Sequence, residues 1–230
     1  IPDTTVSTAF TFSVPSSTSV AIPPGTNLYY SSVPNNQPTE NIYNLQSGIQ
    51  LKKAIIRQGK INFTMANRVY QPLVYRYRLL SATKNNHILD TFFIIPKADS
   101  TTGQLGILNG NIDLTGYAVD FSGLHNGFNS TVETDSVHVA SNASPNGHLY
   151  GGQGFTANFT LKGIIPQYAT GYFGNQTITV GPDTTSFVGF NSIKKGILNL
   201  NSANVSVNIS NQFGVAMKAK ISNLSSINTY

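Results

Sequence analysis

Apolar and polar residues alternate along much of this chain, which is the pattern of β-strands that bury one face. In residues 60–66, for example, Ile61, Phe63 and Met65 alternate with polar neighbours. The same period of two occurs in four further segments, residues 8–14, 155–161, 177–180 and 204–210. Residues 91–95 instead carry a continuous apolar run. Such a run predicts a strand that is covered on both faces.

Helical patterns are scarce in this sequence. Residues 38–47 are the best candidate for a helix, because Thr39 could cap its first turn and Gly48 could end it. Residues 25–37 hold prolines and an Asn-Asn pair, which predict an irregular surface connection. Roughly a dozen short strands with almost no helix predict an all-β protein with an antiparallel β-sandwich of the immunoglobulin-like kind.

Two segments of the chain resemble each other, residues 51–78 and residues 193–220. Each reads as a strand, an Asn-centred turn and a strand with alternating basic residues, and each predicts a hairpin. Either both hairpins belong to one sandwich, or the second begins a further sandwich that is incomplete in this chain. We therefore expect N-terminal strands and an irregular connection in residues 1–48, the main sandwich in 49–188, and in 189–230 a hairpin that completes the sandwich or starts a second domain.

This strand–turn–strand pattern is similar to the repeating core of a known family. The segments Ile61–Arg78 and, more loosely, Val205–Lys220 resemble the late-embryogenesis-abundant type 2, or water-stress-and-hypersensitive, β-sandwich family. The family usually has adjacent Asn and Pro, whereas Asn67 and Pro72 are separated here. Bacterial relatives of the family are extracytoplasmic, often tethered to a membrane and without known catalytic residues. The resemblance therefore implies an extracytoplasmic protein without a catalytic centre.

The amino-acid composition argues against several classes of protein. The 230 residues include 14 Lys and Arg against 9 Asp and Glu, so the net charge is +5, and only 10% of residues are charged. Soluble domains typically contain about 25% charged residues. Uncharged polar residues replace them, with 25 Asn, 23 Ser and 23 Thr. This balance argues against a helical bundle, a coiled coil or a charge-rich disordered tail, and the absence of cysteine excludes disulfides and thiol catalysis.

Aspartate is followed by Ser or Thr at five of its seven positions, more often than composition predicts. Four of these pairs resemble the sequon for O-glycosylation of exported proteins in certain Gram-negative bacteria. Their hydroxyl residues are Thr4, Ser100, Ser136 and Thr184. Glycosylation would place the protein outside the cytoplasm. The alternative is that these pairs are ordinary turn and capping residues, because both side chains bond nearby backbone amides.

Basic residues cluster in the first third of the chain and form a candidate patch for an anionic surface. The patch consists of Lys52, Lys53, Arg57, Lys60, Arg68, Arg76 and Arg78. The alternative is a solvated strand face, since alternating cations protect exposed strands from aggregation. Interleaved tyrosines superficially resemble a surface for single-stranded nucleic acid, but we expect no nucleic acid as partner.

Candidate chemistry is sparse. The four histidines have no ligand spacing, the two glutamates give no placeable carboxylate pair, and no Gly-x-Ser-x-Gly motif occurs. We therefore expect no catalytic, metal-binding or cofactor-binding residues and no cofactor.

The leading hypothesis is a non-catalytic accessory or scaffolding subunit of a bacterial outer-membrane or cell-surface assembly. Such a protein would lie in the periplasm, at the outer membrane or on the cell surface. Its partners would be other envelope or membrane proteins, with the membrane surface or glycans as further candidates. The alternatives are a surface glycan-binding module, which would use exposed aromatic faces, and a viral capsid or fibre protein with a jelly-roll core.

Overall fold

A computed structural model describes most of the first three quarters of the chain. The described residues are 7–16, 19–28, 37–45, 48–174, 210, 218–220 and 222. The chain divides into two compact units, Ile1–Ile178 and Thr179–Tyr230. The expected strands at 177–180 and 204–210 and the second hairpin at 193–220 lie outside the described residues, apart from a few single positions.

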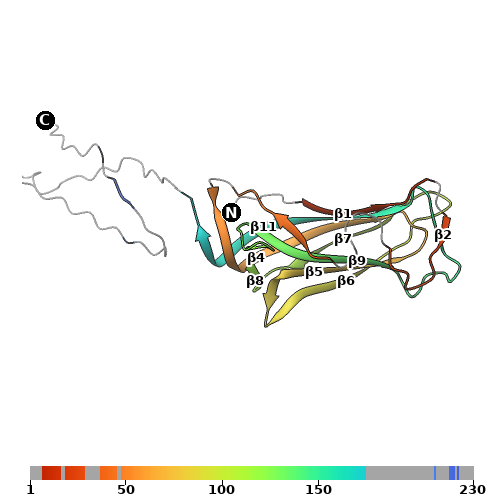
Figure 1. Ribbon diagram of the computed structural model, residues 1–230, viewed down its shortest axis with the longest axis horizontal. Coiled ribbons are helices and arrows are strands. Elements are labelled where there is room, and N and C mark those ends of the chain that lie inside the picture. The colour runs from red at the N-terminus through yellow and green to blue at the C-terminus, as the bar shows by residue number, and fades with distance from the viewer. Residues whose placement is uncertain are drawn as a thin grey trace, which may run out of the picture. The chain divides into compact units, whose positions relative to one another are not determined.

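The first unit is built from strands (Figure 1). They are β1 (Ser7–Ser13), β2 (Ser19–Ala21), β3 (Thr39–Ile42), β4 (Gln50–Asn67), β5 (Leu73–Lys84), β6 (His87–Ile95), β7 (Gly106–Asp113), β8 (Ala118–Asp120), β9 (Ser130–Val139), β10 (His148–Tyr150) and β11 (Gly154–Tyr172). The described part of the chain contains no α-helix. The predicted all-β, sandwich-like antiparallel fold is therefore confirmed.

Nine strands form one curled antiparallel sheet with two halves. In the first half, β4 pairs with β11 on one side and with β7 and β8 on the other. In the second half, β5 pairs with β9, β6 and β8. The short strand β8 joins the halves, because Val119 pairs with both Ala54 of β4 and Ala82 of β5. Strands β2 and β10 form a separate small sheet.

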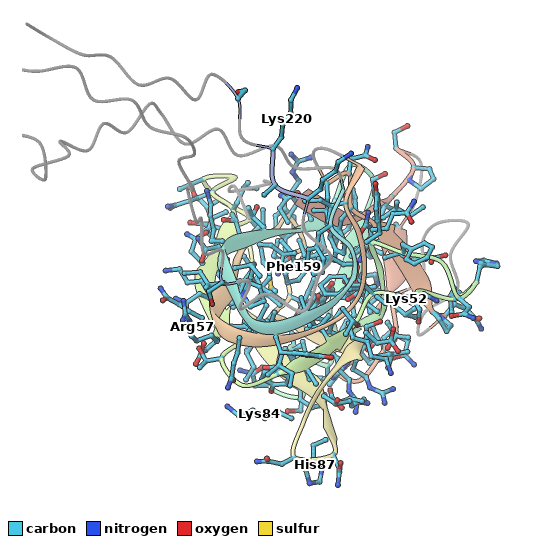
Figure 2. All side chains as sticks on the ribbon, turned by 90° about the vertical axis from the view of Figure 1, so that its left-hand side faces the viewer. Lys52, Arg57, Lys84, His87, Phe159 and Lys220 are labelled. Atoms are coloured by element: carbon cyan, nitrogen blue, oxygen red, sulfur yellow. The ribbon has the colours of Figure 1, made fainter. Side chains whose placement is uncertain are left out.

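The hydrophobic core lies inside the curl. Ile61, Phe63 and Met65 of β4 are buried, as their alternation predicts. Viewed along the sheet in Figure 2, Phe159 of β11 lies within the ring of strands, and Arg57 lies outside it. Complete burial of one such side chain stabilises the fold by about 1.5–3 kcal/mol. The alternation of side chains along β4 and β11 therefore gives the sheet one side that faces the core and one that faces solvent.

The hairpin predicted for residues 51–78 is wrong. The described strands β4 and β5 form no ladder with each other, and the turn between them carries the chain from one half of the sheet to the other. The buried Asn67 holds this turn: its Nδ2 donates to the carbonyls of Gln71 and Pro96, at 2.9 and 2.8 Å, and its Oδ1 accepts from the Val69 amide at 2.7 Å. An asparagine in a turn can serve a crossing between sheet halves as well as a hairpin, so the sequence pattern does not distinguish them.

The helix predicted for residues 38–47 is also wrong. This segment contains β3, which pairs with β9 from Thr39 opposite Glu133 to Ile42 opposite Ser130. The edge of β9 that faces away from β5 offers backbone hydrogen-bonding groups to this segment. Pairing with them is favoured over a helix, because the helical pattern of the segment is weak.

Candidate functional site

Two strongly exposed apolar side chains of the second half lie on β6. Phe92 is 57% exposed and Ile94 is 66% exposed. The prediction that residues 91–95 are covered on both faces is therefore wrong. Among the described strands β6 pairs only with β5, so it is an edge strand, and its outer face carries no second layer. The inner face of β6 is apolar because it packs on the core, where the ring centroid of Phe93 lies 4.4 Å from that of Phe63.

A second edge strand also exposes apolar side chains. Leu105, directly before β7, and Ile107 of β7 are 37% and 44% exposed. Among the described strands β7 pairs only with β4. The two strands meet at their shared loop, where a Cβ on Gly106 would collide with the backbone of Pro96. We call Phe92, Ile94, Leu105 and Ile107 the apolar edge.

One carboxylate pairs with the two cations beside the apolar edge. Arg76 of β5 donates from Nε and Nη2 to the two carboxylate oxygens of Asp90, at 2.9 and 2.6 Å, and Arg78 Nε lies 3.4 Å from the same group. This pairing raises the pKa of Arg76 and lowers that of Asp90. The Arg76 guanidinium also lies over the Phe92 ring, 4.8 Å from its centroid. The contact orients Phe92, and the one carboxylate offsets one of the two positive charges beside it.

The other predicted patch cations lie on or directly after β4. Exposed positions are Lys53, Arg57, Lys60 and Arg68. Lys52 is half-buried: its Nζ donates to Asn126 Oδ1 at 3.2 Å and lies 4.9 Å from the centroid of the Phe128 ring. Because β4 and β5 do not pair, the structure divides the predicted patch between two strands. On β5 the Asp90 carboxylate offsets one of the two positive charges of Arg76 and Arg78. Binding of an anionic surface stays a prediction for the β4 cations alone.

Two predicted O-glycosylation residues lie in the described part of the chain. Ser100 is exposed in the loop between β6 and β7, whereas Ser136 is half-buried in β9 opposite Arg76. Thr4 and Thr184 lie outside the described residues. Asp99 forms the turn at Ser100, since its Oδ1 accepts from the Thr101 amide at 2.7 Å, and this bond lowers its pKa. The turn-forming role is therefore present, and the Ser100 side chain remains accessible to a modifying enzyme.

The sequence interpretation missed two carboxyl groups of β9, the buried Glu133 and the half-buried Asp135. The Tyr75 hydroxyl donates to Asp135 Oδ1 at 2.6 Å. Burial raises the pKa of Glu133, and burial together with the Glu133 charge raises the pKa of Asp135 to about 7. Alternation with Val137 could have placed both acids on the inner face, but Asp135-Ser136 was interpreted as a glycosylation sequon.

These carboxyl groups can hold protons. In the described part of the chain no lysine, arginine or histidine forms an ion pair with Glu133 or Asp135. Burial also raises the pKa of the neighbouring Tyr77 well above its usual value. Two neighbouring carboxyl groups without a cation beside them oppose each other's ionisation. No group of three or more His, Cys, Asp or Glu side chains that could bind a metal ion occurs in this part of the chain.

Glu40 of β3 anchors the loop before β9. Its Oε1 accepts from Ser130 Oγ at 2.7 Å and from the Leu124 amide at 3.2 Å, and its Oε2 lies 3.1 Å from His125 Nδ1. These bonds lower the pKa of Glu40. Gly123 has φ +63° and passes so close that a Cβ would collide with the Glu40 carboxylate. The carboxylate lies between Ser and His, whereas a hydrolytic triad has His next to Ser, so the arrangement is that of a loop anchor.

Comparison with known proteins finds no family model that matches the sequence and no curated protein that is significantly similar to it. The described residues include no helix of the length and hydropathy that crossing a membrane requires.

Proposed function

We propose that this protein is a non-catalytic, extracytoplasmic subunit of a bacterial outer-membrane or cell-surface assembly, and that it binds a partner protein through the apolar edge. The exposure of Phe92 and Ile94 on an edge strand carries this proposal. Edge strands usually carry charges, prolines or bulges that prevent association. The outer face of β6 instead carries two large apolar side chains and one aspartate that is paired within the protein.

The partner would supply an extended strand with apolar side chains. Such a strand would bond the free backbone groups of β6 and cover Phe92 and Ile94. Covering the exposed part of each side chain would contribute about 1–2 kcal/mol, and each new backbone hydrogen bond about 1 kcal/mol. Association itself costs several kcal/mol. A stable complex requires that these contacts together outweigh that cost.

Two observations support the extracytoplasmic location. The segment Ile61–Arg78 resembles a family whose bacterial relatives are extracytoplasmic. Ser100 is an exposed hydroxyl residue within a predicted O-glycosylation sequon. Hexose on Ser100 in the native protein, detected by mass spectrometry of its peptides, would place the chain outside the cytoplasm.

Capture from solubilised envelopes of the producing bacterium tests the proposed contact. Ile94→Asp places a charge on the apolar edge, and Ile42→Asp is the matched control, because Ile42 is 73% exposed on the different edge strand β3. We expect wild type and Ile42→Asp to enrich the same envelope protein, and Ile94→Asp to recover at least about tenfold less of it. Equal recovery by the two variants would contradict the assignment of the surface.

The same preparations address the viral alternative. If the purified protein assembles into closed symmetric particles, seen by electron microscopy, a capsid or fibre role replaces the envelope role.

A further inference from the structure

A second exposed surface lies at the end of the first unit where β2 pairs with β10 (Figure 1). His148 and Tyr150 are two residues apart on β10 and therefore project from the same face of this small sheet. The residues opposite them on β2 are Ala21 and Ser19. These small side chains do not cover the rings on that side, and Tyr150 is 46% exposed. The small sheet thus presents ring faces to solvent.

A third ring joins this surface from a distant part of the chain. Tyr70, in the turn between β4 and β5, has its ring centroid 6.3 Å from that of Tyr150, and the His148 ring lies 6.1 Å from Tyr150 on the same strand. We call Tyr70, His148 and Tyr150 the aromatic shelf. Two separate segments build it, so the arrangement depends on the tertiary fold.

Hydrogen bonds hold the aromatic shelf in place. The Tyr150 amide donates to Gln153 Oε1 at 3.0 Å, and the Gln153 amide donates to the Tyr150 carbonyl at 3.1 Å. Both backbone polar groups of Tyr150 are therefore bonded to a buried glutamine. The two residues after Tyr150 are glycines, so no side chain from this turn covers the ring. A rigid aromatic residue loses little conformational entropy when a ligand binds.

His148 adds a hydrogen-bonding group at the rim. Its Nδ1 lies 3.0 Å from the carbonyl oxygen of Asn146. A carbonyl oxygen only accepts hydrogen bonds, so Nδ1 must carry the hydrogen in this contact. In the neutral ring Nε2 is then an acceptor, and His148 is exposed. The aromatic shelf therefore combines apolar ring faces with a hydrogen-bond acceptor and the Tyr150 hydroxyl.

We propose that the aromatic shelf binds a saccharide chain. A sugar ring has faces of C–H groups, which pack on aromatic rings, and a rim of hydroxyls, which bond groups such as His148 Nε2 and Tyr150 Oη. Surfaces for single-stranded nucleic acid combine stacking rings with cations. In the described part of the chain, the cation–π pairs involve Phe92, Tyr117 and Phe128, and none involves the aromatic shelf. The chemistry therefore favours an uncharged polyhydroxylated ligand.

Fluorescence polarisation with labelled cellohexaose, chitohexaose, maltohexaose and mannohexaose tests the proposal on the full chain. We expect at least one probe to bind, and Tyr150→Ala to weaken its binding about tenfold, because one ring–sugar contact is lost. Tyr168→Ala is the matched control, since Tyr168 is 57% exposed on β11, outside the aromatic shelf. Its dissociation constant should stay within about twofold of wild type.

A second variant keeps the test decisive if Tyr150→Ala does not fold. Ser19→Leu leaves all three rings in place and covers them from the opposite strand, at an exposed position that tolerates substitution. We expect it to block binding as well. Failure of all four probes at about 5 mM, or equal binding by Tyr150→Ala and Tyr168→Ala, would overturn the proposal. Ile94→Asp should bind the probes normally, so failure here is distinct from failure of the apolar edge.

Discussion

Replacement of Asp135 by asparagine should make the protein more resistant to unfolding at neutral and alkaline pH. Asparagine keeps an oxygen that can accept the hydrogen bond from the Tyr75 hydroxyl, at the same position as Asp135 Oδ1. It removes the carboxyl group whose ionisation is opposed by burial and by Glu133. The substitution therefore isolates the cost of a buried charge from the loss of a contact.

The magnitude follows from the two pKa values of Asp135. The carboxyl group has an ordinary pKa of 3.8, which applies to the unfolded chain, and a pKa of about 7 in the folded protein. Below pH 4 both states hold the proton and the group has no effect. Between pH 4 and 7 the unfolded state alone releases it, so the free energy of unfolding falls by about 1.4 kcal/mol per pH unit, to a total of about 4 kcal/mol.

Urea unfolding, followed by circular dichroism between pH 4 and 8.5, measures this difference. Wild type and Asp135→Asn should have similar stability at pH 4, and the variant should be more stable by about 4 kcal/mol at pH 8. Glu133 gives both proteins a residual slope of the same sign, because its pKa is also raised. Asp99→Asn, at an exposed turn, should follow wild type above pH 5. Parallel curves for wild type and Asp135→Asn would refute the reasoning.

Two further substitutions test the turn and the loop anchor. Asn67→Ala should lower the free energy of unfolding by about 2–4 kcal/mol in urea, because the Val69 amide and the Pro96 carbonyl lose their partner; an effect below 1 kcal/mol would mean that water replaces the amide. Gly123→Ala should lower it by about 1–3 kcal/mol and speed proteolysis of the loop, since φ is +63° and the methyl group displaces Glu40; unchanged cleavage would show that the loop has other anchors.

Alternation predicted strands correctly where the two faces of a strand differ in polarity. Ile61, Phe63 and Met65 alternate with polar residues, and the structure buries all three. The apolar run in residues 91–95 was wrongly predicted to be covered on both faces. A central strand and an edge strand with an exposed apolar face can have the same apolar sequence. The pairing partners of the strands could not be predicted either. No local sequence pattern distinguishes a hairpin after Asn67 from a crossing between the halves of the sheet.

The candidate sites depend on contacts between distant residues. Arg78 was recognised as a cation, but its ion pair follows from the β5–β6 register, which places it opposite Asp90. The turn of this hairpin did carry a local pattern, because Asn85 and Asn86 both have positive φ, as in a type I′ turn. No local pattern brings Tyr70 beside Tyr150, and that proximity required the complete fold.

The pairing of the first described strand with the last has a consequence for biogenesis. Ser7 lies opposite Thr160, so β1 cannot take its place until nearly all of the first unit has been synthesised. Ladders between such distant segments form slowly, because a long loop must close before any stabilising hydrogen bond can form. A nascent chain with this topology stays unfolded for longer than one built from neighbouring hairpins. The first half of the sheet is therefore complete only after β11 has been synthesised.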